Sequence, residues 1–131
     1  MSATITPLHP RARPNLLVAD RDPVERCLVC DRLREEGYRV LEAHSPDAAT
    51  AILTSLPVHL LLLDASLEAG EGRPSLIRCA EALRPPPVVI VIGAREMLSR
   101  LRNLADVTAV ERPCALPDLV AIIRSKLAPM A

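Results

Sequence analysis

Short apolar segments and amphipathic segments alternate along this chain from about residue 15 to residue 128. Five of the apolar segments have the length of β-strands: residues 16–19, 38–43, the run between Pro57 and Asp64, residues 88–92 and residues 107–110. Each is followed by a stretch with apolar residues at helical spacing. The pattern therefore predicts a strand followed by a helix, five times over.

Two of the predicted helices begin with clear N-terminal signals. Asp22-Pro23 and Ser45-Pro46 each place a capping side chain before a proline that suits the first helical position, and Gly37 suits the end of the first helix. The predicted inward-facing residues, taken helix by helix, are Val24, Leu28 and Leu33; Ala48, Ala49, Ile52 and Leu56; Leu76, Ile77, Ala80 and Leu83; Met97, Leu98, Leu101 and Leu104; and Leu116, Val120, Ile123 and Leu127.

Strands that alternate with helices are expected to be parallel and joined by right-handed crossovers. The first, third and fourth strands are apolar throughout, as central strands buried on both faces are. Arg39 and Glu42 interrupt the second strand and indicate an edge. We expect a single three-layer α/β/α domain over residues 15–131, preceded by a flexible tail at residues 1–14 that contains three prolines.

Composition and charge narrow the function classes. Hydrophobic residues make up 50% of the 131 residues, but Tyr38 is the only aromatic one, so the core must be aliphatic and no aromatic platform can stack nucleic-acid bases. The 16 acidic and 16 basic residues cancel, which leaves no basic footprint. We therefore expect no nucleic-acid partner.

The chain also lacks a signal-peptide core and any apolar run of membrane length, so we expect a cytoplasmic location and no membrane association. The four cysteines, Cys27, Cys30, Cys79 and Cys114, are expected to be buried free thiols. Cys27 and Cys30 have the spacing of a zinc-binding pair, but they fall within a predicted helix and no second pair accompanies them.

Charged residues gather at one edge of the predicted sheet. Asp20 ends the first strand and Asp64 ends the third, and the ends of the fourth and fifth strands are followed by Gly93-Ala94 and Arg112. In open parallel sheets, ligands bind outside the carboxyl ends of the strands. If the first and third strands are neighbours, we expect the carboxylates of Asp20 and Asp64 to share one crevice with Arg112 beside them.

At these positions the chain resembles the receiver domain of bacterial two-component response regulators. Residues 18–23 (VADRDP) are similar to the acidic turn of that family, and residues 61–72 (LLLDASLEAGEG) to its phosphoacceptor segment. Residues 36–43 and Arg112-Pro113 also fall where the family has similar residues. The resemblance covers residues 15–128 and implies a flavodoxin-like sheet with strand order 2-1-3-4-5.

By this resemblance, Asp64 would accept a phosphoryl group from a histidine kinase or a phosphotransfer protein. Mg²⁺ would be held by Asp20, Asp64 and the backbone carbonyl of Ser66, and the phosphate would be contacted at Gly93, Ala94 and Arg112. A downstream protein partner would bind the face formed by the fourth helix, the fifth strand and the fifth helix. The formation of a homodimer is left open as an alternative.

Four positions depart from the family pattern. Arg21 stands where the second acid of the turn, a metal ligand, is expected, and Gly93 replaces a serine or threonine. Arg112 replaces the lysine, and Lys126, the only lysine, lies too far along the last helix to substitute for it. Ala109 occupies the position of an aromatic switch residue.

These departures suggest a site that neutralises itself, with Asp20 and Asp64 facing Arg21 and Arg112. Guanidinium groups form bidentate pairs with carboxylates and stay protonated. We therefore hypothesise that an arginine, with Arg21 as one candidate, partly takes the place of the metal, so that Mg²⁺ binding is weak or absent and phosphorylation is inefficient.

Three interpretations follow. The first is a stand-alone receiver module without an output domain, which is not an enzyme and acts through protein contacts. The second is a pseudo-receiver that serves as a phosphorylation-independent docking platform. The third is a small enzyme or ligand-binding protein on the same scaffold, although the sequence offers it no positioned general base and no phosphate-cradling loop.

Overall fold

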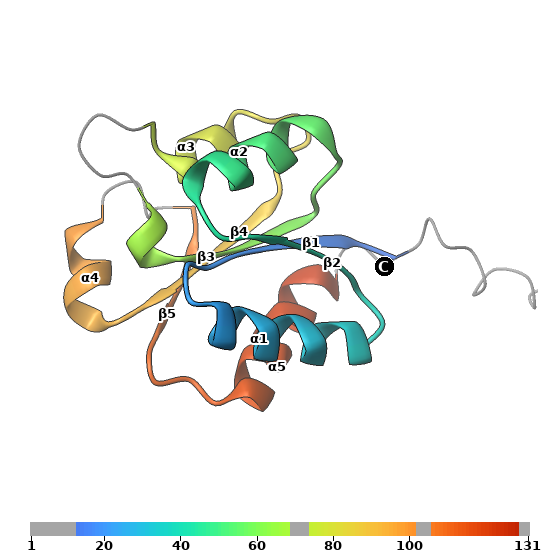
Figure 1. Cartoon of the computed structure of the whole chain (residues 1–131), viewed down its shortest axis with the longest axis vertical. Coiled ribbons are helices and arrows are strands. Elements are labelled where there is room, and N and C mark those ends of the chain that lie inside the picture. Colours follow the sequence, from blue (N-terminus) through green and yellow to red (C-terminus); the bar gives the residue numbers. More distant parts are fainter. Residues whose placement is uncertain (1–12, 69–73, 102–105, 129–131) are drawn as a thin grey trace, which may run out of the picture.

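The computed structural model describes residues 13–68, 74–101 and 106–128, which form a five-stranded parallel sheet with helices on both faces (Figure 1). The strand order is β2-β1-β3-β4-β5, which confirms the predicted fold class and order. The predicted tail falls almost entirely on residues 1–12, outside the described residues. The strands are β1 (Asn15–Ala19), β2 (Arg39–Ala43), β3 (Leu60–Asp64), β4 (Val88–Gly93) and β5 (Thr108–Glu111).

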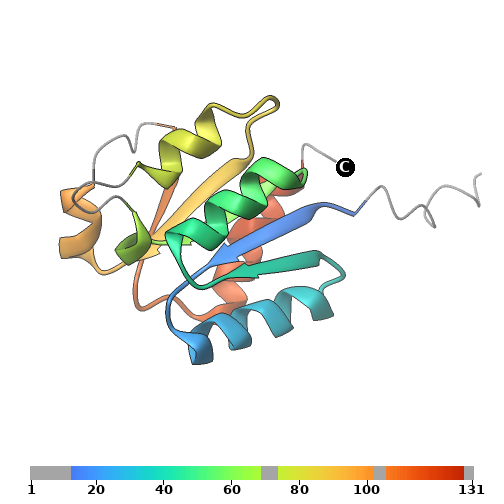
Figure 2. The ribbon, with the colours of Figure 1, turned by 45° about the horizontal axis from the view of Figure 1, so that its top comes forward.

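The helices α2 and α3 cover one face of the sheet, and α1 and α5 cover the other (Figure 1). In the turned view of Figure 2, α2 lies in front of the strands and α5 behind them. The helices are α1 (Pro23–Glu35), α2 (Pro46–Ser55), α3 (Leu76–Glu81), α4 (Arg95–Arg100) and α5 (Leu116–Leu127), and the 3-10 turn η3 (Ala65–Leu67) follows β3 directly.

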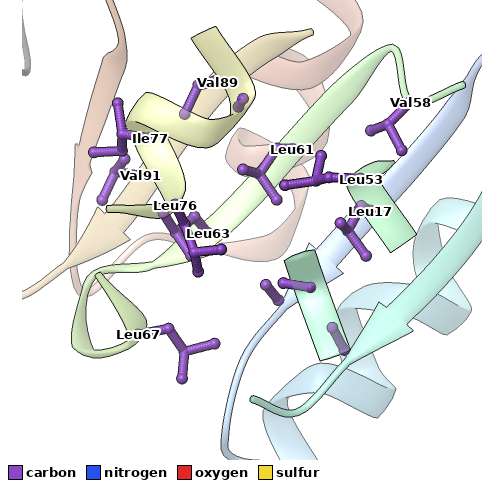
Figure 3. Close-up of a cluster of buried hydrophobic side chains, with 14 of the residues drawn as sticks. Leu17, Leu53, Val58, Leu61, Leu63, Leu67, Leu76, Ile77, Val89 and Val91 are labelled. Carbon is purple, nitrogen blue, oxygen red and sulfur yellow. The ribbon is translucent and has the colours of Figure 1, made fainter. Parts of the chain in front are cut away.

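The core is aliphatic and consists of one cluster on each face of the sheet. Every residue of β3 is buried, and because successive side chains of a strand point to opposite faces, this strand contributes to both clusters. Leu61 and Leu63 pack beneath α2 and α3 (Figure 3). Leu60 and Leu62 pack on the opposite face, against α1 and α5. The central position of β3 therefore fixes Asp64 at the middle of the sheet edge.

The predicted helix starts are observed. The side chain of Asp22 accepts hydrogen bonds from the backbone N–H groups of Val24 (2.9 Å) and Glu25 (3.4 Å), and Ser45 caps α2 in the same way. Gly37 has φ of 99°, a left-handed conformation that glycine adopts without strain. These local signals therefore behave as their residue types predict.

The predicted inner face of α1 is confirmed for Leu33 and wrong for Val24 and Leu28. Val24 is 69% exposed and Leu28 is 60% exposed, whereas Cys30 and Leu33 are buried. The apolar residues of α1 are spread around the helix, so the sequence does not define one stripe. The sheet selects the face that contains Cys30 and Leu33, with Val29 partly buried beside them.

Smaller corrections apply to other helices. Leu56 lies just beyond α2 and is 46% exposed, while Leu53 is buried in its place. Met97 of α4 is 37% exposed, and Leu104 lies outside the described residues. All four cysteines are free thiols as predicted, but only Cys30 is buried: Cys27 is exposed, and Cys79 and Cys114 are half-buried.

No helix in the described part of the chain is both long enough and apolar enough to span a lipid bilayer.

Candidate functional site

The structure brings Asp20 and Asp64 together at the carboxyl edge of the sheet. Asp20 follows the last residue of β1, Asp64 is the last residue of β3, and these two strands are parallel neighbours. Both residues are buried, at 7% and 9% exposure, and both line the same cavity. The expected shared crevice is therefore present.

Arg112 enters this crevice from the end of β5 and contacts three carboxylates. Its Nη1 donates to Oδ1 of Asp64 at 2.6 Å and lies 3.4 Å from the carbonyl oxygen of Ile92. Its Nη2 donates to the carboxylate of Glu25 and lies 3.7 Å from Oδ2 of Asp20. The planar guanidinium thus lies among the acidic side chains, as its fork of donors allows.

Glu25 is a site residue that the sequence analysis missed. It belongs to the first turn of α1, where an acidic residue is usually read as a favourable partner of the helix dipole. Its position near Asp20 could have been predicted. Helical side chains tilt towards the N-terminus of their helix, and the N-terminus of α1 adjoins the end of β1. Carboxylate oxygens of Asp20, Glu25 and Asp64 lie within 4.8 Å of one another.

Arg21 does not join this cluster. Its side chain is exposed, and it forms no hydrogen bond or ion pair with any residue in the described ranges. The predicted self-neutralising set is therefore wrong in its composition, because Glu25 is present and Arg21 is absent. Three carboxylates around one guanidinium carry a formal net charge of −2.

Burial and charge act on the ionisable groups of the site. Burial raises the pKa of Asp20, and the negative charges of Asp64 and Glu25 raise it further, against a hydrogen bond from the backbone N–H of Asp22 that lowers it. Burial acts to lower the pKa of Arg112, but its bonds to Asp64 and Glu25 outweigh this, and its pKa is raised. Arg112 therefore stays charged, but its single positive charge does not balance the negative charges of the three carboxylates.

The second oxygen of Asp64 is also engaged. Oδ2 accepts a hydrogen bond from the backbone N–H of Ser66 at 3.0 Å and another from the Ser66 hydroxyl. Ser66 belongs to the turn η3 that begins directly after Asp64. The backbone of Ser66 thus lies next to the Asp64 carboxylate, and the role of the Ser66 carbonyl as a metal ligand stays a prediction.

Gly93 and Ala94 follow the neighbouring strand β4. A Cβ atom at position 93 would lie 2.7 Å from the Cβ of Ala65, so this close approach requires glycine. The carbonyl oxygen of Gly93 accepts a hydrogen bond from the backbone N–H of Arg112 at 2.9 Å. Ala94 precedes α4 and is exposed, without a side-chain cap. Neither residue supplies a hydroxyl, and their phosphate contacts stay predictions.

The cavity at this edge has a volume of about 310 Å³. Its charged residues are Asp20, Glu25, Asp64 and Arg112, and the other lining residues are mostly apolar. Hydrophobic side chains of α1, α5 and the sheet form most of this apolar lining: Val18, Leu28, Val29, Leu62, Ile92, Leu116 and Leu119. The charged groups therefore border a largely apolar hollow.

The remaining predicted residues lie away from the crevice. Ala109 is exposed on β5, and Lys126 lies roughly 15 Å along α5 from the start of that helix. Nδ1 of His59 accepts a hydrogen bond from the backbone N–H of Asn15 at 2.9 Å, which agrees with a locally satisfied strand residue. Gly72 of the resembling segment lies outside the described residues.

The donor set suits a hard divalent cation, because Mg²⁺ and Ca²⁺ bind carboxylate and carbonyl oxygens. Asp20 and Asp64 could hold such an ion, and the net negative charge of the cluster favours one. Arg112 already contacts the same carboxylates, so a cation and the guanidinium would share them.

No protein-family model matches the chain. The phosphate regulon transcriptional regulatory protein PhoB of Klebsiella pneumoniae is 33% identical over 128 residues, which cover 92% of this chain and 55% of that protein. The chain thus spans about half the length of this relative.

Solved structures show the same fold. A CheY-like response regulator receiver domain protein of Methanospirillum hungatei superposes with a TM-score of 0.75 at 24% identity, covering 90% of this chain and 96% of that one. The response regulator TrrA of Thermotoga maritima, in complex with Mg²⁺ and BeF, superposes with a TM-score of 0.67 at 23% identity, covering 86% and 97%.

Proposed function

We propose that this chain, which has the fold of receiver domains and is similar in sequence to response regulators, is a phosphorelay module in which Asp64 accepts a phosphoryl group. The donor is a histidine kinase or a phosphotransfer protein. The observation that carries this proposal is the position of Asp64, a buried carboxylate at the end of the central strand that lines a cavity beside a guanidinium.

The step is a phosphoryl transfer between two nucleophiles. A carboxylate oxygen of Asp64 attacks phosphorus, the phosphorus–nitrogen bond to the donor imidazole breaks, and an acyl phosphate forms on Asp64. Arg112 lies within hydrogen-bond distance of Asp64 and would contact the transferred oxygens. Mg²⁺, when bound, would neutralise charge on the phosphoryl oxygens, and Asp20 and Asp64 would hold it.

Two features support a slow reaction. Both oxygens of Asp64 accept hydrogen bonds, from Arg112 and from Ser66, so the nucleophile must exchange a partner before it attacks. No hydroxyl is available at position 93 to contact the phosphoryl group. We therefore propose that phosphorylation is inefficient and that it serves signalling rather than turnover, so the chain is not an enzyme.

We propose that a downstream protein binds the α4–β5–α5 face. Nε of Arg95 on α4 donates to Glu111 on β5 at 2.8 Å, which ties these two elements together. The exposed Ala109 lies on the same strand, so an aromatic side chain cannot report phosphorylation there. The proposed location is cytoplasmic, where a kinase would deliver the phosphoryl group.

The alternative function is a phosphorylation-independent docking platform. The observation that favours it is the ion pair between Arg112 and Asp64, which stabilises the site without phosphate. The two functions differ in one measurable property, the covalent phosphorylation of Asp64.

Incubation with a small-molecule phosphodonor and Mg²⁺, followed by intact-mass spectrometry, tests the proposal. We expect a partial gain of one phosphoryl group that Asp64→Asn abolishes. Asp118→Asn, which changes an exposed aspartate on α5, is the matched control and should leave the gain unchanged. If neither the small donor nor a phosphorylated phosphotransfer protein modifies the native chain, the docking function takes its place.

A further inference from the structure

We propose that Glu25, on the first turn of α1, replaces the acid missing at position 21 as a ligand of the divalent-cation site, and that Arg112 holds its carboxylate whenever no cation is bound. This inference concerns the same site as the proposed function. It rests on cation binding alone, so its test does not depend on whether Asp64 accepts phosphate.

The position of Glu25 follows from how α1 begins. Asp22 caps the helix and accepts a hydrogen bond from the backbone N–H of Glu25 itself, so Glu25 lies within the first turn. Its side chain therefore tilts back towards the end of β1, where Asp20 lies. Arg21, next to Asp20 in the chain, is exposed and leaves this volume to the carboxylate of Glu25.

The spacing of the three acids suits a divalent cation. Their ligand oxygens lie within 4.8 Å of one another. Opposite ligands of Mg²⁺ are about 4.2 Å apart, twice its bond length, and those of Ca²⁺ are about 4.6–5.2 Å apart. The 4.8 Å limit falls within the separation of opposite ligands of Ca²⁺ and a few tenths of an ångström above that of Mg²⁺, so the three carboxylates are close enough to bind one divalent ion together.

Arg112 acts on the same oxygens as a cation would. It donates to Asp64 and Glu25 and approaches Asp20, which are the three members of the cluster. One positive charge against three negative charges leaves the group unbalanced, whereas a divalent ion would remove the excess. Glu25 is therefore expected to exchange its partner, from Arg112 to the cation, as the cation binds.

A competing explanation is that Glu25 is only a structural ion-pair partner of Arg112 near a helix N-terminus. In that case its removal would change the melting temperature of the cation-free protein and leave the affinity for cations as it was. The two explanations therefore predict different cation affinities for a chain without the Glu25 carboxylate, and calorimetry measures that affinity directly.

The test is a calorimetric titration of the native chain, Glu25→Gln, Glu35→Gln and Arg112→Met with Mg²⁺, Mn²⁺ and Ca²⁺. Glu35 lies on α1, is exposed and provides the same charge change on the same helix. We expect Glu25→Gln to weaken binding about tenfold or more, because even partners outside the ligand shell alter metal affinity by about 10–100-fold. Glu35→Gln should bind like the native chain, and Arg112→Met should bind more tightly.

Where native binding is too weak to measure, the same comparison is made in the Arg112→Met background. Equal affinities for Glu25→Gln and Glu35→Gln would overturn the inference, and so would the absence of binding in both the native chain and Arg112→Met. A chain that binds cations through Glu25 but gains no phosphate would refute the proposed function and leave this inference standing.

Discussion

Replacement of Gly93 by serine would restore a hydroxyl at the end of β4, yet we expect it to destabilise the domain. The new Cβ would lie 2.7 Å from the Cβ of Ala65, closer than two methyl-type carbons can approach. Ala65 cannot move alone, because it is buried in the turn that follows Asp64. Overpacking of this kind typically costs about 1–3 kcal/mol, so we expect Gly93→Ser to lose about that much unfolding free energy.

The same geometry predicts a compensating partner. Ala65→Gly removes the opposing Cβ, and by itself it should cost about 0.5–1 kcal/mol from backbone entropy plus about 0.8 kcal/mol from the lost buried methyl group. The double variant should be more stable than the sum of the two losses predicts. A favourable coupling energy of about 0.5–3 kcal/mol is the range for residues in direct contact.

Urea unfolding followed by circular dichroism measures the unfolding free energy of the native chain, the two single variants and the double variant. An unchanged slope of this free energy against urea concentration would show that compactness is preserved. Gly93→Ala is the control that adds the Cβ without the hydroxyl, and it should lose about as much as Gly93→Ser. A Gly93→Ser variant as stable as the native chain, or strictly additive losses in the double variant, would refute the steric argument.

Three further predictions concern other parts of the domain. Burial raises the pKa of Cys30 to about 12, so thiol reagents should label the exposed Cys27 in the native protein and reach Cys30 only after denaturation, as read by peptide mass spectrometry. Asp22→Ala removes the cap of α1 and should lower the unfolding free energy by about 1 kcal/mol in urea. The hydrogen bond from Arg32 lowers the pKa of Glu36, so Glu36 should add stability that is lost as pH falls through that lowered pKa, and Glu36→Gln should lack this component in pH-dependent melting.

Each of these predictions has a contrary outcome. Labelling of Cys30 at the rate of Cys27 in the native state would mean that α1 opens readily from the sheet. An Asp22→Ala variant with native stability would show that water satisfies the helix amides equally well. If the melting temperatures of the native chain and Glu36→Gln fell equally as pH is lowered, Glu36 would not contribute to the pH dependence of stability.

The central strands and one edge strand could be predicted from local sequence signals, whereas the full strand order came from the resemblance to receiver domains. The unbroken leucine run before Asp64 defines a central strand, and Arg39 and Glu42 define an edge. Once β1 and β3 are neighbours, Asp20 and Asp64 must share the same edge.

Side-chain partners could not be predicted in the same way. Glu25 reaches the site because of the rotation of α1, and the scattered apolar residues of that helix do not reveal its rotation. The same uncertainty explains why Val24 and Leu28 were expected to face inwards although both are exposed. Adjacency in sequence also made Arg21 a candidate for the crevice, whereas its side chain is exposed.

The central claim is that Asp64 itself carries the phosphoryl group. After treatment with a phosphodonor and Mg²⁺, borohydride reduces an acyl phosphate of aspartate to homoserine, and peptide mass spectrometry locates that change in the chain. The account predicts homoserine at position 64, in an amount that falls when Mg²⁺ is withheld. Homoserine at any other aspartate, or an unmodified position 64 in protein that has demonstrably gained phosphate, would contradict it.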